Sequence, residues 1–151
     1  MLFPRNGGYV AEQRKLPAHW FLTLKVIVNK RILVVDDNAL VRGLVREFIE
    51  SRPGFEICGE AADGFEGVEK GLELRPDLIV LDFLMPRING LQAAMMLREI
   101  VPATPIILFT VYKDETISSL AHNAGVASVI SKTEQLTILA DEVQKLTGWT
   151  N

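Results

Sequence analysis

Five residues that could do chemistry follow runs of strand-forming residues in this chain. They are Asp36 and Asp37 after Ile32–Val35, Asp82 after Leu78–Leu81, Thr110 after Ile106–Phe109, and Lys132 after Val126–Ser131. Carboxylate oxygens are the ligands that Mg²⁺ prefers. An ionised aspartate is also a nucleophile that forms an aspartyl-phosphate in phosphoryl transfer. These residue types indicate a divalent metal and a phosphoryl group, provided that the fold brings them together.

The elements that must position these residues alternate regularly between strand and helix. Expected strands cover residues 31–35, 55–59, 77–81, 105–110 and 126–131, and expected helices cover 39–51, 113–124 and 134–146, with two more ending near 75 and 101. This alternation predicts βα units and a parallel sheet. Right-handed crossovers around a central first strand give a flavodoxin-like, doubly wound α/β fold, with strand order 2-1-3-4-5 and helices on both faces. The uniformly apolar third strand is expected in mid-sheet.

The helical segments carry apolar residues at the spacing of a buried face. The expected inward residues are Val41, Leu44, Val45 and Phe48 in the first helix, Ile117, Leu120, Ala121 and Ala124 in the fourth, and Leu136, Leu139, Ala140, Val143 and Leu146 in the last. Asn38 is expected to cap the first helix, and Gly125 suits the left-handed residue that closes the fourth. Asn89-Gly90 is interpreted as a turn signal before the third helix.

In this strand order the first and third strands are neighbours, so Asp36, Asp37 and Asp82 are expected to share one small volume. Their like charges repel without a counter-ion, and Mg²⁺ suits a site of carboxylates and waters. Mg²⁺ and the Lys132 ammonium balance the three carboxylates, so the pocket accepts an incoming phosphoryl dianion. Asp82 is ionised at neutral pH and needs no general base. The metal, Lys132 and the Thr110 hydroxyl would stabilise the transferring group.

The segment from about Arg31 to Leu146 resembles the response-regulator receiver domain of two-component signalling. The stretches that carry the resemblance are Ile32–Asn38, Asp77–Pro86, Asn89-Gly90, Leu108–Thr110 and Ser131-Lys132. The resemblance implies that Asp82 is the phosphoacceptor. It implies that Asp36, Asp37, Asp82 and the backbone carbonyl of Leu84 hold Mg²⁺. It further implies that Thr110 follows the phosphoryl group as a switch hydroxyl and that Lys132 pairs with it.

We therefore expect a single-domain receiver that takes its phosphoryl group from a histidine kinase or phosphotransfer protein and signals to a downstream protein. No catalytic turnover is expected beyond slow self-catalysed phosphorylation and dephosphorylation, and a homodimer is one possible assembly. With no output domain after Asn151, output is expected through the fourth helix, fifth strand and last helix. For Ile138 and Trp149, an exposed contact and packing within the domain both stay open.

Two other functions fit parts of the pattern. A receiver-like module that works by interaction alone, without phosphate, is the main alternative, and the intact acidic set argues against it. An aspartate-dependent phosphohydrolase on a similar sheet would be expected to carry an Asp-x-Asp arrangement, in which the second carboxylate is a general acid. In this chain that second position is Leu84. A flavodoxin is disfavoured because the turn after the first strand is acidic, where a phosphate cradle needs Gly, Ser or Thr.

Three positions depart from the receiver pattern. Thr133 follows Lys132 where many members of the family have proline, which leaves the geometry of that loop open. Val129 stands where an aromatic residue is frequent, so an aromatic rotamer switch coupled to Thr110 is not expected. Val111 follows Thr110 where small residues are frequent, and its bulk predicts slower turnover of the phosphoryl group.

Composition places these residues in one soluble domain. The chain has 151 residues, of which 48% are hydrophobic and 23% charged. We expect a basic, partly disordered N-terminal extension over 1–29, a receiver domain over 30–147 and a tail over 148–151. The extension has four basic residues and one acidic residue, or +3, which leaves −6 for the remainder of a chain with net charge −3. The acidic body argues against direct DNA binding.

The chain is also expected to be cytoplasmic and free of the membrane. No apolar run approaches the roughly 20 residues that a bilayer requires. The only cysteine is Cys58, which excludes an intramolecular disulfide and is typical of a reducing compartment. Its expected role is that of a small buried hydrophobe. Whether Trp20–Val28 packs on the domain or adds a strand stays open.

Overall fold

The computed structural model describes residue 17 and residues 28–149. Its elements in chain order are β1 (Lys30–Val35), α3 (Ala39–Glu50), β2 (Phe55–Ala61), α4 (Gly64–Leu74), β3 (Leu78–Leu81), α5 (Gly90–Ile100), β4 (Ile106–Thr110), α6 (Glu115–Asn123), β5 (Ser128–Ser131) and α7 (Leu136–Thr147). The predicted alternation of strands and helices is confirmed. The predictions for the N-terminal extension up to residue 27, including an additional strand, lie outside the described residues apart from residue 17.

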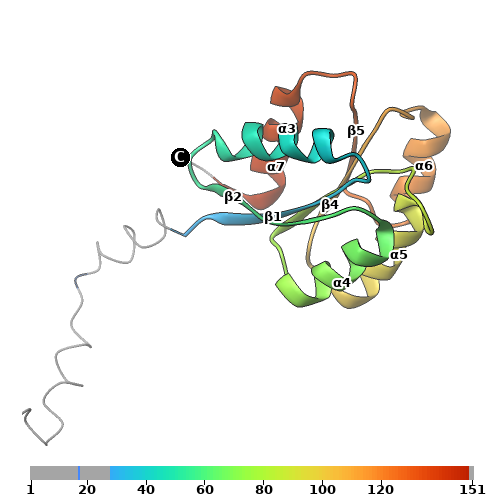
Figure 1. Cartoon of the computed structure of the whole chain (residues 1–151), viewed down its shortest axis with the longest axis horizontal. Helices are drawn as coiled ribbons and strands as arrows, with labels where there is room; N and C mark the ends of the chain where they lie inside the picture. Colours follow the sequence, from blue (N-terminus) through green and yellow to red (C-terminus); the bar gives the residue numbers. More distant parts are fainter. Residues whose placement is uncertain (1–16, 18–27, 150–151) are drawn as a thin grey trace, which may run out of the picture.

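The five strands form one parallel sheet in the order β2-β1-β3-β4-β5, as predicted. β3 lies in the middle, and its four residues are buried on both faces, as the uniformly apolar sequence predicts. Figure 1 shows α3 and α7 on one side of the sheet and α4, α5 and α6 on the other. Because all strands are parallel, their carboxyl ends lie along the same edge.

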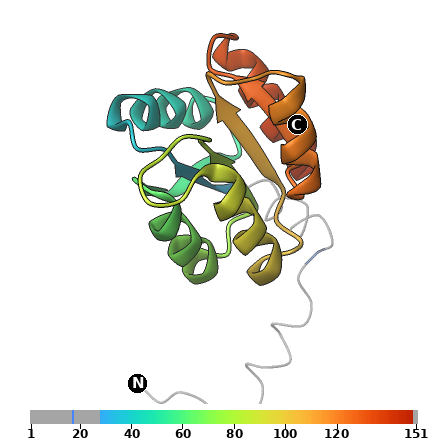
Figure 2. The ribbon, with the colours of Figure 1, turned by 90° about the vertical axis from the view of Figure 1, so that its right-hand side faces the viewer.

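Each face of the sheet has its own core. On one face, Val45 and Ile49 of α3 pack with Leu139 and Val143 of α7. On the other face, α5 and α6 contribute mainly small residues, which bring these helices close to the sheet: Ala93, Ala94, Ala121 and Ala124. Figure 2, turned by 90°, shows these helices arranged around the sheet. The buried stripe predicted for α7 is confirmed.

Two residues predicted to be buried are exposed. Leu44 of α3 is 48% exposed and Leu120 of α6 is 47% exposed. In α3 the buried line runs through Val45 and Ile49, and Leu44 lies about 100° around the helix from Val45. In α6, Ala121 faces the core, and its neighbour Leu120 lies about 100° around the helix from it.

The helix ends explain how the loops at the two edges of the sheet are held. Asn38 caps α3 as predicted, since its side chain accepts the N–H groups of Leu40 and Val41. Gly125 has a φ of +87° just after α6, which also confirms its prediction. The interpretation of Asn89-Gly90 as a turn was wrong, because Asn89 is the N-cap of α5 in a capping box with Gln92.

Gly90 instead serves a close approach between α5 and the end of β3. Its N–H donates to the carbonyl of Phe83 at 2.6 Å. A Cβ at this position would lie 2.0 Å from the carbonyl oxygen of Asp82. Only glycine allows the start of α5 to lie against the backbone of the residue that follows β3.

β2 contains an irregularity that the sequence did not indicate. Ile32 of β1 pairs with Ile57, but the next residue, Leu33, pairs with Gly59, which leaves Cys58 as the additional residue of a bulge. Before the bulge, Ile57 packs in the core beneath α3 and α7. After it, Ala61 packs in the opposite core. The bulge therefore reverses the direction of the side chains in the second half of the strand.

Cys58 itself is free and half-buried, and it packs against the core on the side of α4 to α6. Burial raises the pKa of its thiol, which keeps the group in its unreactive form. Within residue 17 and residues 28–149, none of the helices has both the length and the apolar character needed to cross a bilayer.

Candidate functional site

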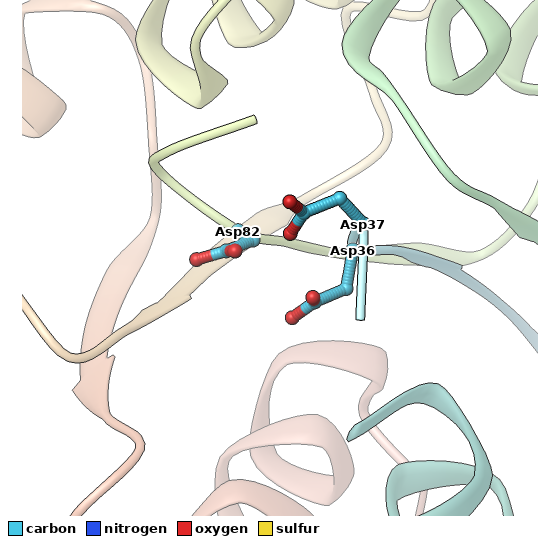
Figure 3. Close-up of side chains that lie close together, drawn as sticks. All are labelled: Asp36, Asp37 and Asp82. Carbon is cyan, nitrogen blue, oxygen red and sulfur yellow. The ribbon is translucent and has the colours of Figure 1, made fainter. Parts of the chain in front are cut away.

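Three carboxyl groups meet at the carboxyl edge of the sheet. Asp36 and Asp37 follow β1, and Asp82 follows β3, the neighbouring strand. One carboxylate oxygen from each of the three lies within 4.8 Å of the others. Figure 3 shows the three side chains gathered around the ends of these strands. Asp36 and Asp82 are buried, at 3% and 7% exposure, while Asp37 is exposed. The cluster therefore has a buried floor and one side open to water.

Lys132 brings the only ammonium group that contacts this cluster among the described residues. Its Nζ lies 2.6 Å from Asp36 Oδ2 and 3.2 Å from Asp82 Oδ2. Burial lowers the pKa of Lys132, but the hydrogen bond with Asp36 and the attraction of Asp82 together raise it above its ordinary value. The ammonium is thus held in its charged form between the ends of β1 and β3, although Lys132 itself follows β5.

The electrostatics of the cluster indicate a deficit of positive charge. Burial, followed by repulsion from Asp36, raises the pKa of Asp82, and the attraction of Lys132 only partly offsets this. Three carboxylates and one ammonium leave an excess of two negative charges, which one divalent cation would balance. Because hard oxygen ligands and an open, hydrated side suit Mg²⁺, the residues present fit that ion.

Backbone groups fix the two buried carboxylates. The N–H of Asn38 donates to Asp36 Oδ1 at 2.8 Å, and the N–H of Phe83 donates to Asp82 Oδ1 at 2.8 Å. Neither donor could be predicted from the sequence, since a backbone N–H has no residue signature of its own. An Asp two residues before a helix N-cap is the available signal for the first, because this spacing is typical of an Asx-turn.

Thr110 lies buried at the end of β4, between β3 and β5. Its Oγ1 accepts the N–H of Tyr112 at 3.2 Å. The Tyr112 ring packs edge-on against Phe83, with the ring centroids 6.3 Å apart. The loop after β4 thus lies against the loop after β3. Thr110 is connected through Tyr112 to Phe83, the residue that follows Asp82. Leu84, whose carbonyl was predicted as a metal ligand, lies in that second loop with a side chain that is 48% exposed.

The three positions that depart from the receiver pattern have definite surroundings. The Lys132–Thr133 peptide bond is trans, and the Thr133 hydroxyl lies 2.7 Å from Ser131 Oγ. Val129 is half-buried against the core on the side of α6, and Val111 is 55% exposed. Slower phosphoryl turnover and the lack of an aromatic switch stay predictions.

A second layer of charged residues lies behind Asp36. Arg42 of α3 donates to the backbone carbonyl of Asp36 at 2.6 Å and to Glu60 Oε1 at 3.0 Å. Arg46, one turn further along α3, also binds Glu60. This layer was not predicted from the sequence. Its only signal was the pair of arginines four residues apart on one helix face.

Comparisons of this chain with a family model and with known proteins agree on one family. The family model described as "Response regulator receiver domain" matches residues 32–144. Chemotaxis protein CheY of Thermotoga maritima is 34% identical over 119 residues, which cover 79% of this chain and 98% of that protein. The protein-glutamate methylesterase/protein-glutamine glutaminase of Pyrococcus abyssi is 41% identical over 98 residues, which cover 62% of this chain and 26% of that protein. This chain thus matches only about a quarter of the length of these methylesterases.

Solved structures agree with this result. The response regulator domain of Thermotoga maritima CheB has a TM-score of 0.75 and 30% identity, over 82% of this chain and 99% of that one. A two-component response regulator of the LuxR family from Aurantimonas has a TM-score of 0.77 and 30% identity, over 80% and 86%. The fold, the acidic cluster at the carboxyl edge and the family match over residues 32–144 together show that the chain belongs to the response regulator receiver domain family.

Proposed function

We propose that this protein accepts a phosphoryl group on Asp82 from a phosphohistidine of a histidine kinase or phosphotransfer protein, and passes the signal on by protein contacts in the cytoplasm. The observation that carries the proposal is the cluster of Asp36, Asp37 and Asp82 around one small volume with Lys132 beside it. Asp82 is the best candidate for the nucleophile because it follows β3, the central strand of the sheet, and its carboxylate lies 3.2 Å from the Lys132 ammonium.

The transfer forms a bond between a carboxylate oxygen of Asp82 and phosphorus, and breaks the bond between phosphorus and the donor's imidazole nitrogen. The donor keeps the electron pair of the broken bond and takes up a proton. Asp36, Asp37, Asp82 and the carbonyl of Leu84 would hold Mg²⁺, which neutralises charge on the phosphoryl oxygens. The exposed Asp37 leaves the open side of the cluster as the approach for the donor.

Lys132 and Thr110 would respond to the new group. Phosphorylation adds about 1.5 to 2 negative charges, which attract the ammonium already held between Asp36 and Asp82. Thr110 Oγ1 accepts a hydrogen bond from Tyr112, so its own proton is free to be donated to a phosphoryl oxygen. A shift of Thr110 toward Asp82 would pull on Tyr112 and on the loop that leads to α6.

The signal would then be read on α6, β5 and α7, by a downstream protein or by a second copy of this chain. Ile138 of α7 is 43% exposed on this surface and is available for contact. Trp149, the other residue considered for this role, is half-buried against the core and packs edge-on on Phe55, with the ring centroids 6.0 Å apart. We therefore assign Ile138 and not Trp149 to the contact surface.

Incubation with Mg²⁺ and a small phosphodonor, followed by mass spectrometry of the intact protein, tests the proposal. The wild type should gain the mass of one phosphoryl group, and Asp82→Asn should gain none. Omission of Mg²⁺ should abolish the gain. A wild type that gains no mass while folded and saturated with Mg²⁺ would favour the interaction module that works without phosphate.

A further inference from the structure

Within residues 28–149, Arg42 is the one side chain that connects the backbone of Asp36 to a charged group on another strand. Its Nη1 donates to the Asp36 carbonyl and its Nε donates to Glu60 Oε1. The Arg42 side chain is 17% exposed and that of Glu60 is 30% exposed, so both ends of this connection lie largely away from water. The guanidinium fork is planar, and holding one end against Glu60 therefore fixes the direction of the other end.

The bulge in β2 explains why Glu60 can take part. Cys58 packs on the side of α4 to α6, and a Cβ on Gly59 would meet Leu74 of α4 on that same side. Glu60, the next residue, therefore points to the opposite face, where α3 lies. In a regular strand that continued the alternation of Phe55 and Ile57, Glu60 would point away from α3. Bulges often redirect a side chain beside a functional site.

Glu60 is itself fixed by more than Arg42. Arg46 donates to its Oε2 at 2.7 and 3.0 Å, and Lys70 donates to its backbone carbonyl. Hydrogen bonds and charge attraction from the two arginines lower the pKa of Glu60, so the carboxylate stays ionised near neutral pH. Arg42 thus joins Asp36 to an anchor that is held independently from α3 and α4.

We infer that Arg42 is a positioning residue: through its bond to the Asp36 carbonyl, with Glu60 as anchor, it sets the affinity of the acidic cluster for Mg²⁺. The inference rests on the proposed function of that cluster. Groups that hold metal ligands in place without touching the metal commonly contribute about 10- to 100-fold to metal affinity. The Asp36 backbone is otherwise tied by its N–H to Ala61 of β2, so its carbonyl depends on Arg42.

Arg46 offers a matched control. It lies on the same helix face and binds the same carboxylate, but none of its hydrogen bonds in the structure involves Asp36. Simple charge effects predict that removal of either arginine strengthens Mg²⁺ binding, since a nearby positive charge disappears. The positioning role predicts the opposite sign for Arg42 alone.

The test is calorimetric titration of the full chain with Mg²⁺ for the wild type, Arg42→Met and Arg46→Met. We expect Arg42→Met to bind Mg²⁺ at least about tenfold more weakly and Arg46→Met to stay within about threefold of the wild type. Excess Mg²⁺ should restore phosphorylation of Arg42→Met by a small phosphodonor, which it would not do for a distorted pocket. Equal affinities of Arg42→Met and the wild type, or equal losses in both variants, would overturn the inference.

A second variant keeps the test decisive if Arg42→Met does not fold. Glu60→Gln leaves the guanidinium in place but weakens its anchor, and we expect an intermediate loss of about threefold in Mg²⁺ affinity, as a fraction of the Arg42 effect. An unchanged affinity in Glu60→Gln would then contradict the role of the anchor. If the wild type binds no Mg²⁺ at all, the proposed function fails and not this inference alone.

Discussion

The two ends of the sheet differ in how their charged groups are paired. At the carboxyl edge, Asp36, Asp82 and Thr110 are buried, and like charges lie close together. At the amino edge, where the strands begin, the groups of Lys30, Arg31, Gly54 and Asp77 are paired by hydrogen bonds, and the aromatic contact of Trp149 with Phe55 covers the core. The same strands therefore have one end arranged for stability and one end that retains electrostatic repulsion. Functional sites in proteins commonly retain such costs.

The amino edge shows what matched polar groups look like in this molecule. The Arg31 N–H donates to Asp77 Oδ2 and the Asp77 N–H donates to the Arg31 carbonyl, both at 2.8 Å. The Lys30 N–H donates to the carbonyl of Gly54 at 2.8 Å. Next to these bonds, Trp149 packs on Phe55. The backbone and carboxylate groups named here all have partners, whereas the buried indole N–H of Trp149 has none among the described residues. The charged groups at this edge are therefore paired, and its one unpartnered buried group in that part of the chain is neutral.

The largest change in stability is expected from Gly90→Ala, at the carboxyl edge. The added Cβ would lie 2.0 Å from the carbonyl oxygen of Asp82, a backbone atom that cannot move aside. We expect a loss of about 3 kcal/mol or more in the free energy of unfolding, together with loss of phosphorylation. Urea unfolding and mass spectrometry measure the two effects.

Gly43→Ala is the control for that substitution. Gly43 lies within α3, is exposed, and has nothing within 4 Å of an added Cβ. Alanine there should stabilise the protein by about 0.5 to 1 kcal/mol through helix propensity alone. Equal effects at positions 90 and 43 would show that the contact between α5 and the Asp82 backbone has no influence on folding.

Trp149→Ala tests the amino edge. The ring is half-buried against Phe55, and we expect a loss of about 2 to 3 kcal/mol, below the usual range for a fully buried aromatic residue because Trp149 is partly exposed. Mg²⁺ affinity and phosphorylation of Asp82 should not change, because the ring lies at the opposite end of the strands. A weakened metal site in a folded Trp149→Ala protein would contradict the separation of the two edges.

The sequence predicted the convergence of Asp36, Asp37, Asp82 and Lys132 because strand ends are visible as a change from apolar to polar residues. Parallel topology then places those ends on one edge. The sheet order and the Asn38 cap followed from equally local signals. Features that a short stretch of sequence determines by itself could be predicted, and the burial of the uniformly apolar central strand is one of them.

The rest depended on relations between distant segments. Leu120 has the spacing of a buried residue, but it is exposed while its neighbour Ala121 is buried, and which of the two faces the core depends on how α6 packs on the sheet. The bulge at Cys58 lies in a stretch with ordinary strand composition, and only the pairing with β1 reveals it. Since Glu60 faces α3 because of that bulge, its contact with Arg42 could not be predicted from the alternation of residues in β2.

Glu60→Gln tests a matched charge at the carboxyl side of the molecule. The two arginines lower the pKa of Glu60, so its folded pKa is below the unfolded value of about 4.3. Its contribution is therefore fully present above that value and is lost as the pH falls through the folded pKa. We expect Glu60→Gln to lose about 1 to 2 kcal/mol at pH 7.

The pH dependence separates this effect from general acid unfolding. The difference between wild type and Glu60→Gln should be constant from pH 7 down to about pH 5 and should shrink below about pH 4. Urea unfolding midpoints at each pH measure it. A difference that grows on acidification would mean that Glu60 is not stabilised as the carboxylate in the folded state.

Asp82→Asn should give a smaller change than Glu60→Gln, with the opposite sign. Burial and repulsion from Asp36 raise the pKa of Asp82, which means that its ionised form is less favourable in the folded protein than in water. The neutral amide keeps the shape of the carboxyl group and removes the repulsion, while Lys132 keeps its pair with Asp36 at 2.6 Å. Without Mg²⁺ at pH 7, we expect a gain of about 1 kcal/mol in the free energy of unfolding.

Addition of Mg²⁺ should make the wild type more stable than Asp82→Asn, because the wild type holds the ion with one more carboxylate. A loss of stability without Mg²⁺ would mean that Lys132 more than offsets the repulsion, and that both edges of the sheet contain matched charges.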